Sequence, residues 1–162
     1  MLLGGSDNDS LEGGYGADVL LDGADGDALS GGAGHDLLLG GAGNDTLNPG
    51  ASDDMILFSA GDGQDHLVAS GGGSDTLSLG GGIAYGDFVF SKSGNDLVLD
   101  DTDQIIFSGW YSSSSSRTVV TLQMIAEAMD DFDAGGDAPL LDQNVETFDF
   151  AGLVNAFDAA RT

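Results

Sequence analysis

Single apolar residues recur every nine positions through the first third of the chain, separated mostly by glycine and aspartate. They form one column: Leu11, Leu20, Leu29, Leu38, Leu47 and Ile56. Each is the middle one of three residues that can form a short β-strand, in which only the middle side chain points inward. The pattern therefore predicts a series of short strands whose inward side chains stack into a thin core.

Aspartate keeps the same period. In six consecutive nonapeptides covering residues 4–57, position six is always aspartate and position eight is leucine or isoleucine. After Leu57 the frame slips, because the aspartates of residues 61–67 and 71–77 fall eleven and then ten residues after the previous one. We predict a repeat domain over residues 1–82, with degenerate repeats in 58–82. Leu2 lies one period before Leu11, so we expect the array to continue upstream.

The glycines of each repeat supply the sharp turns. Glycine adopts positive φ without a Cβ clash, so the first six residues of a repeat can reverse the chain. Two nonapeptides then close one coil of eighteen residues with two short strands. Stacked coils pair as parallel ladders about 4.8 Å apart. The fold class predicted is all-β.

Three units match the pattern GGxGxDxUx at every defined position, namely residues 13–21, 31–39 and 40–48. In this respect the chain resembles the C-terminal repeat region of RTX (repeats-in-toxin) exoproteins, which include toxins, serralysin-type proteases, lipases and large adhesins. The resemblance implies a right-handed parallel β-roll that binds several Ca²⁺ ions. A flexible glycine- and aspartate-rich linker is the competing interpretation, and the two unbroken columns argue against it.

The charge of the chain supports a cation as the partner. There are 28 Asp+Glu against 3 Lys+Arg, and the formal net charge is −25. No basic patch can be built, which excludes nucleic acid as a partner. There is no cysteine and no apolar run long enough to span a membrane. Aspartate suits turns and compact oxygen cages for hard cations.

The predicted core is too small to hold the repeats together. Burial of one leucine contributes roughly 2–3 kcal/mol, whereas ordering each of nine backbones costs about 1–2 kcal/mol. Ca²⁺ takes six to eight oxygens from carboxylates and carbonyls. Because alternate turns lie on the same side of the roll, we expect an ion to bridge the aspartates of repeats i and i+2. Folding and ion binding are then one event, and the chain without calcium is predicted to be disordered.

The predicted metal ligands follow from these positions. The carboxylates are those of Asp9, Asp18, Asp27, Asp36, Asp45, Asp54, Asp65 and Asp75. By resemblance to the family, main-chain carbonyls at positions one and three join the cages: Gly13, Tyr15, Asp22, Ala24, Gly31, Ala33, Gly40 and Ala42. Asp7, Asp25 and Asp53 are either further ligands or solvated turn residues, and His35 and His66 are interpreted as exposed spacers.

The second half of the chain has a different pattern. Residues 87–91, 96–100 and 104–107 are predicted strands with turns at 94–95 and 101–103. This segment resembles the flank that follows the last repeats in several RTX proteins, including adenylate cyclase toxins. We therefore predict a cap over residues 83–131, in which Phe88, Phe90, Phe107 and Trp110 are core residues. Residues 119–129 are predicted to form a helix, because Val119, Leu122, Ile125 and Met129 are spaced for one face.

The last segment, residues 132–162, is predicted to be a linker followed by a short amphipathic helix. Phe150, Leu153, Val154 and Phe157 mark the apolar face of that helix. Three roles stay open for it: part of a C-terminal type I secretion signal, a helix that docks on the cap, or the start of a further domain.

The functional prediction is a calcium-binding module that folds on Ca²⁺ after type I secretion of a larger exoprotein. It implies a secreted or cell-surface location, transient contact with the type I secretion machinery, and a monomeric state. The alternative is a structural or adhesive segment of a large bacterial surface adhesin. The sequence contains neither HExxH nor G-x-S-x-G, so no catalytic residues are predicted and the chain is not expected to be an enzyme.

Overall fold

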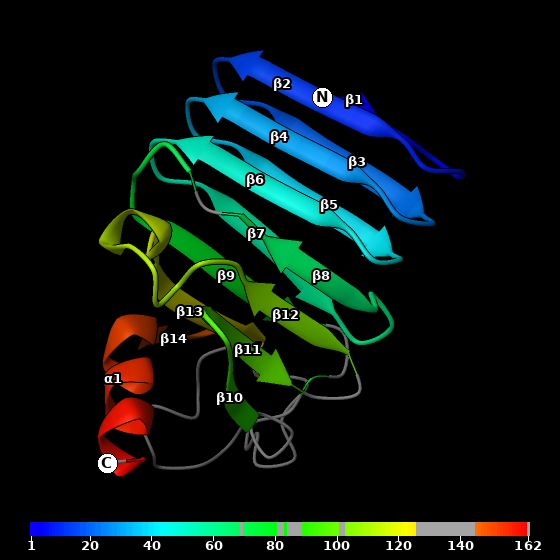
Figure 1. Cartoon of the computed structure of the whole chain (residues 1–162). Helices are drawn as coiled ribbons and strands as arrows, with labels where there is room; N and C mark the ends of the chain where they lie inside the picture. The colour runs from blue at the N-terminus through cyan, green and yellow to red at the C-terminus, as the bar shows by residue number, and fades with distance from the viewer. Residues whose placement is uncertain (69, 81–82, 84–88, 101–102, 126–144, 162) are drawn as a thin grey trace, which may run out of the picture.

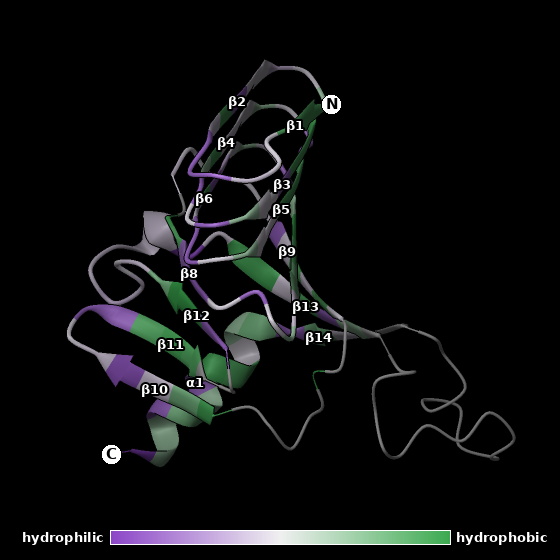
Figure 2. Ribbon diagram, turned by 90° about the vertical axis from the view of Figure 1, so that its right-hand side faces the viewer, coloured by the Kyte–Doolittle hydropathy of each residue, from purple (hydrophilic) through white to green (hydrophobic). Residues whose placement is uncertain are grey.

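The computed structural model describes all residues except 69, 81–82, 84–88, 101–102, 126–144 and 162. Two β-sheets face each other and form a flattened tube, which is closed at one end by a helix (Figures 1 and 2). Along the first sheet the strand order is β1 (Leu2–Leu3), β3 (Val19–Ala24), β5 (Leu37–Ala42), β7 (Met55–Ser59), β9 (Asp75–Gly80), β13 (Val119–Ile125) and β14 (Val145–Asp149). Along the second it is β10 (Val89–Ser93), β11 (Asp96–Asp100), β12 (Gln104–Phe107), β8 (Gln64–Leu67), β6 (Thr46–Ala51), β4 (Ala28–Ala33) and β2 (Ser10–Tyr15).

The first part of the chain is a parallel β-roll, as the nine-residue period predicts. Each strand pairs in parallel with the strand one full coil later, and the column residues pair with one another, as Leu11 does with Leu29 and Leu20 with Leu38. The column is buried throughout: Leu20 and Leu38 are 0% exposed, and Leu67 and Leu77 extend it into the degenerate repeats. The predicted thin core is therefore confirmed.

The strands are longer than the three residues that the apolar pattern marks. In β4, for example, the strand continues from Leu29 through Gly31 and Gly32 to Ala33. Glycine is required there because the coils approach each other closely. A Cβ on Gly32, whose φ is +105°, would collide with the backbone carbonyl oxygen of Gly14 in the preceding coil.

The second half of the chain continues both sheets. Strand β12 pairs in parallel with β8, and β13 pairs in parallel with β9, so the last strands of the roll gain hydrogen-bonded neighbours. The β10–β11 hairpin and β14 then add antiparallel strands. The strands predicted at 96–100 and 104–107, and the turn at 94–95, are confirmed. Of the strand predicted at 87–91, residues 89–91 belong to β10, while Asp87 and Phe88 lie outside the described residues.

The helix predicted over residues 119–129 is wrong for the part that the structure describes. Residues 119–125 form strand β13, and residues 126–129 lie outside the described residues. A β-bulge between Val119 and Thr121 explains the error, because one extra residue lets Val119 and Leu122 both face the core at a helix-like spacing of three. Val119, Val120 and Thr121 are β-branched, which favours the strand.

Helix α1 (Phe150–Ala160) closes the end of the roll, which confirms a helix in the last segment. Asp149 begins it by accepting a hydrogen bond from the Gly152 amide. Phe150 is 0% exposed, and its ring centroid lies 5.0 Å from that of Phe107 and 5.5 Å from that of Trp110. The linker predicted before this helix lies outside the described residues.

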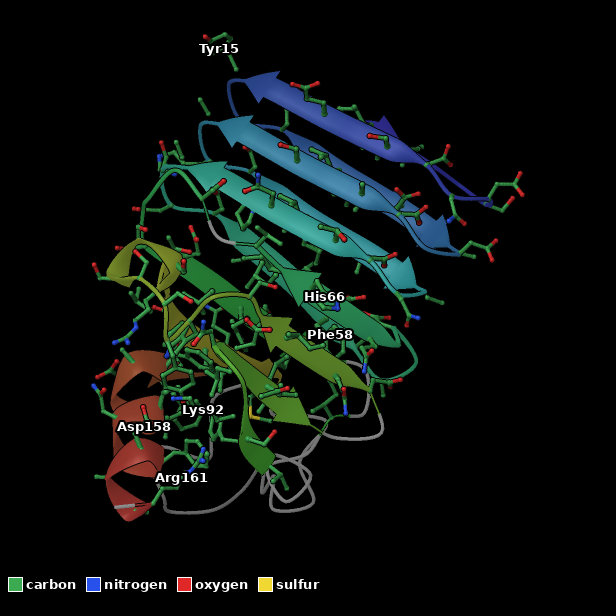
Figure 3. All side chains as sticks on the ribbon, viewed as in Figure 1. Tyr15, Phe58, His66, Lys92, Asp158 and Arg161 are labelled. Atoms are coloured by element: carbon green, nitrogen blue, oxygen red, sulfur yellow. The ribbon has the colours of Figure 1, made fainter. Side chains whose placement is uncertain are left out.

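On the outer side of the cap, Tyr111 connects the hairpin to α1. Its hydroxyl donates a hydrogen bond of 2.9 Å to Asp158, and the Lys92 ammonium lies 4.0 Å from the centre of its ring. Figure 3 shows Lys92, Asp158 and Arg161 gathered on this side. The helix is thus attached by an apolar contact and by a polar one.

Candidate metal centre

The turns between strands, and the first residues of β8 and β9, place the predicted aspartates in two rows, one along each long edge of the roll. The first row is Asp9, Asp27, Asp45 and Asp65, and the second row is Asp18, Asp36, Asp54 and Asp75. Within a row, each carboxylate after the first accepts a hydrogen bond from the backbone amide of the aspartate one coil earlier. The distances from the amide nitrogen to the Oδ1 atom are 2.8 Å for the Asp9–Asp27 and Asp36–Asp54 pairs and 3.1 Å for Asp54–Asp75.

These hydrogen bonds use only one oxygen of each carboxylate. The Oδ2 atom is buried and has no hydrogen-bond partner in five members of the two rows: Asp27, Asp36, Asp45, Asp54 and Asp75. Their side chains are between 0% and 4% exposed. A buried carboxylate oxygen without a donor is costly unless a cation neutralises it. Their arrangement fits a hard divalent cation that prefers oxygen ligands.

Where position one of a repeat is glycine, the missing side chain leaves space for the Oδ2 atom of the aspartate at position six of the same repeat. A Cβ built on Gly31 would lie 2.6 Å from Asp36 Oδ2, and one on Gly13 would lie 3.1 Å from Asp18 Oδ2. One on Gly40 would collide with Asp45 Oδ2. In the repeats that begin at Gly13, Gly31 and Gly40, position one therefore has to lack a side chain for the carboxylate of the same repeat to turn inward as it does. The cradle fits a bound ion.

The electrostatics of the rows point the same way. Burial is the largest cause that raises the pKa of Asp54 to about 6 and that of Asp65 to about 7, and neighbouring carboxylates add to it. Burial likewise raises the pKa values of Asp45 and Asp75. The protein environment therefore opposes the ionised form of these groups. A cation between them would stabilise that form.

The residues predicted to offer carbonyls lie in the second half of their strands, before these turns. Gly13 and Tyr15 are on β2, Asp22 and Ala24 on β3, Gly31 and Ala33 on β4, and Gly40 and Ala42 on β5. The carbonyls of Ala33 and Ala42 already accept hydrogen bonds, from the Gly16 and Asp25 amides, at 2.8 and 3.0 Å. A carbonyl oxygen has a second lone pair, so both can still contribute to a cage. The role of these carbonyls as ligands stays a prediction.

The residues for which the sequence left alternatives are all exposed. Asp25 accepts a 3.3 Å hydrogen bond from the Asp7 amide, and Asp53 accepts one of 2.9 Å from the Ser74 amide. Both carboxylates therefore accept hydrogen bonds from backbone amides of neighbouring turns. His35 contacts the Asp53 carbonyl, and His66 lies on the outer face of β8 (Figure 3). Tyr15, whose side chain is 95% exposed, points away from the roll in the same view.

Three acidic side chains near the rows were not predicted as carboxylate ligands. Asp22 turns its side chain toward Asp9 and Asp27. Asp62 is buried in the turn before β8 and accepts from the Ser59 amide, while Asp103 accepts from the amides of Gly61 and Gly63. The sequence offered a signal only for Asp22, an acid at a position that otherwise holds glycine or proline. Asp103 comes near the first row only because β12 pairs with β8.

Both rows end where the cap begins. In the sheet register, Asp65 lies opposite Ile105 of β12, and Asp75 lies opposite Val119 of β13. Ile105 and Val119 are buried apolar residues. No carboxylate therefore continues either row at these positions.

The comparisons with known proteins agree with this geometry. The family model described as RTX calcium-binding nonapeptide repeat (4 copies) matches residues 1–21 and 21–56. No curated protein matches the chain significantly. Among the described residues, no helix has the length and apolar character needed to cross a membrane. Residues 1–56, with their two rows of inward-turned aspartates, thus match the RTX calcium-binding nonapeptide repeat, and the β-roll is consistent with an RTX repeat protein.

Proposed function

We propose that the chain is the calcium-driven folding module of a larger exoprotein exported by type I secretion. The observation that carries the proposal is the set of five buried Oδ2 atoms without a hydrogen-bond partner, stacked along the two edges of the roll. Each needs a positive partner. The described residues provide few, because the chain has 3 Lys+Arg in total.

Ca²⁺ would be held between successive aspartates of a row, together with backbone carbonyls of the turns. Asp27 and Asp45 would contribute to one such site on the first edge, and Asp36 and Asp54 to one on the second. The ion supplies positive charge and six to eight coordination positions. The chain supplies turns that are already shaped by glycine, so that ion binding and coil formation stabilise each other.

This coupling suits export through a channel. Calcium is scarce in the bacterial cytosol, so the repeats would stay unfolded and able to pass through a narrow conduit. Outside the cell, calcium would fold the emerging coils and prevent backsliding. The cap is consistent with folding after export. Strands β12 and β13 pair with the last strand edges of the roll, and α1 covers its end, so that the coils have a closed end on which to stack.

Circular dichroism and small-angle X-ray scattering test the proposal. With a chelator, we expect an expanded chain with little strand signal, and with millimolar Ca²⁺ a compact β-rich one. NaCl at matched ionic strength is the control for general screening, which lowers repulsion without filling a cage. Mg²⁺ is the second control, because it demands a tighter octahedral shell. A chelated chain that is already compact and fully β would overturn the proposal.

A further inference from the structure

One cage of the roll differs from the others in its charge. Among the six repeats in residues 4–57, position one is glycine in four, Pro49 in one and Asp22 in one. Asp22 lies in β3, on the first edge, and its carboxylate shares a cage with Asp9 and Asp27. One ligand atom from each of these three residues lies within 4.8 Å of the other two.

The side chain of Asp22 is directed into that cage. Both of its carboxylate oxygens are buried and have no hydrogen-bond partner. Gly4 makes room for it, because a Cβ on Gly4 would collide with the Asp22 carboxylate. An acid that only solubilised the surface would turn its oxygens toward water.

Asp27 gives an independent sign that the cage takes a ligand. It is 3% exposed, its Oδ1 atom accepts a 2.8 Å hydrogen bond from the Asp9 amide, and its Oδ2 atom has no partner. This free oxygen belongs to the group that includes Asp22. The half-buried Asp22 and the buried Asp27 thus present unpaired oxygens to one space between residues 4–12 and 22–30 of adjacent coils.

We propose that the Asp22 carboxylate is a direct cation ligand that makes this three-carboxylate cage the tightest cation site of the roll and favours trivalent over divalent ions. The inference rests on the proposed function, because it assumes that the rows bind calcium. The affinity of oxygen cages for hard cations rises with the number of charged ligands. A third negative charge strengthens the attraction for a 3+ ion more than for a 2+ ion, since Coulomb energy scales with the product of the charges. Lanthanide ions such as Tb³⁺ prefer oxygen ligands as Ca²⁺ does, and they therefore serve as the trivalent probe.

Calorimetric titration of the whole chain with Ca²⁺, and with Tb³⁺ in competition with Ca²⁺, tests the proposal. For Asp22→Asn, we expect the tightest class of sites to weaken by on the order of tenfold or more, and the preference for Tb³⁺ over Ca²⁺ at that class to fall. Asp22→Gly, which restores the consensus residue, should give the same loss while keeping the β-roll. Asp25→Asn is the matched control. Asp25 is an exposed turn carboxylate three residues after Asp22, so its substitution removes the same charge but should leave the tight class of sites unchanged.

The outcomes separate this inference from the proposed function. A wild-type chain that binds no Ca²⁺ refutes the proposed function, and this inference with it. A wild-type chain that binds Ca²⁺ with a tight class unaffected by both Asp22 substitutions refutes only the role of Asp22. Equal losses in the Asp22 and Asp25 variants would mean that net charge, and not ligation, sets the affinity. If Asp22→Asn fails to fold, the Asp22→Gly titration decides.

Discussion

Replacement of Gly31 by alanine tests whether this position must lack a side chain for the cage of its own repeat to form. Gly31 lies in β4, outside the left-handed φ region, so alanine can adopt its backbone conformation. The new Cβ would lie 2.6 Å from Asp36 Oδ2, and closer still to the Pro49 carbonyl oxygen of the next coil. Cβ atoms essentially never approach other heavy atoms within 3.0 Å, so one of these groups has to move.

Neither group moves easily. The carbonyl of Pro49 belongs to the backbone of β6, and the Asp36 carboxylate is held by its 2.8 Å hydrogen bond from the Asp18 amide. Overpacking of this kind costs about 1–3 kcal/mol. For a chain of this size that corresponds to a fall in Tm of roughly 2–12 °C, given about 2–4 °C per kcal/mol. The methyl group also occupies space next to the free oxygen, so we expect the second edge to lose one bound ion.

Gly14→Ala is the matched control. Gly14 has a φ of +96°, and a Cβ there would meet nothing within 4 Å, so alanine costs only left-handed backbone strain of about 1–2 kcal/mol. Both variants should melt earlier in calcium, as measured by circular dichroism. Only Gly31→Ala should lower the ion count in calorimetry or in native mass spectrometry. An unchanged ion count and Tm in Gly31→Ala would refute the argument that the cage needs this space.

Three further substitutions test the core and the cap. Leu38→Ala, at a side chain 0% exposed, should lower the unfolding free energy in saturating Ca²⁺ by about 2–5 kcal/mol in denaturant titrations, and an equal loss in half-buried Leu37→Ala would contradict the inward column. Phe150→Ala should cost about 3–5 kcal/mol and change the fluorescence of Trp110, whose ring contacts it; an unaltered emission spectrum would argue against α1 as the closing element. Burial, and then the hydrogen bond to Asp158, raises the pKa of Tyr111 to about 12. Because this value lies above the ordinary 10, the associated stability is complete below pH 10 and is lost as the pH rises through 12. A phenolate absorbance titration should lose a step near pH 12 in Tyr111→Phe, and an identical titration in both proteins would count against this environment.

The repeats made most of the roll predictable from the sequence. A period of nine, with leucine and aspartate two positions apart, fixes which side chain turns inward and which closes a turn. Stacking identical coils then leaves little freedom in register, so that Leu20 has to meet Leu38. The pairing of aspartates one coil apart follows from the same geometry.

The cap was less predictable because its register comes from tertiary contacts and not from a period. The segment after residue 118 carries a helix-like spacing of apolar residues, yet strand β9 offers a free edge, and β-branched residues can take it once a bulge corrects the parity. Asp103 gave no repeat signature for a similar reason. Its position beside Gly61 and Gly63 results from the pairing of β12 with β8, residues about forty positions apart in sequence.

The register of the cap also determines where the cation sites can end. A cage of the kind inferred here needs carboxylates in two adjacent coils, and a buried apolar side chain at the second position removes both the charge and the free oxygen. Ile105 occupies that position opposite Asp65, and Val119 occupies it opposite Asp75. The strands that satisfy the last hydrogen-bonding edges of the roll thus also stop both aspartate rows. If the next coil carried aspartate in place of Ile105 or Val119, its carboxylate would face the aromatic core of Phe107, Trp110 and Phe150, where burial would make its charge costly.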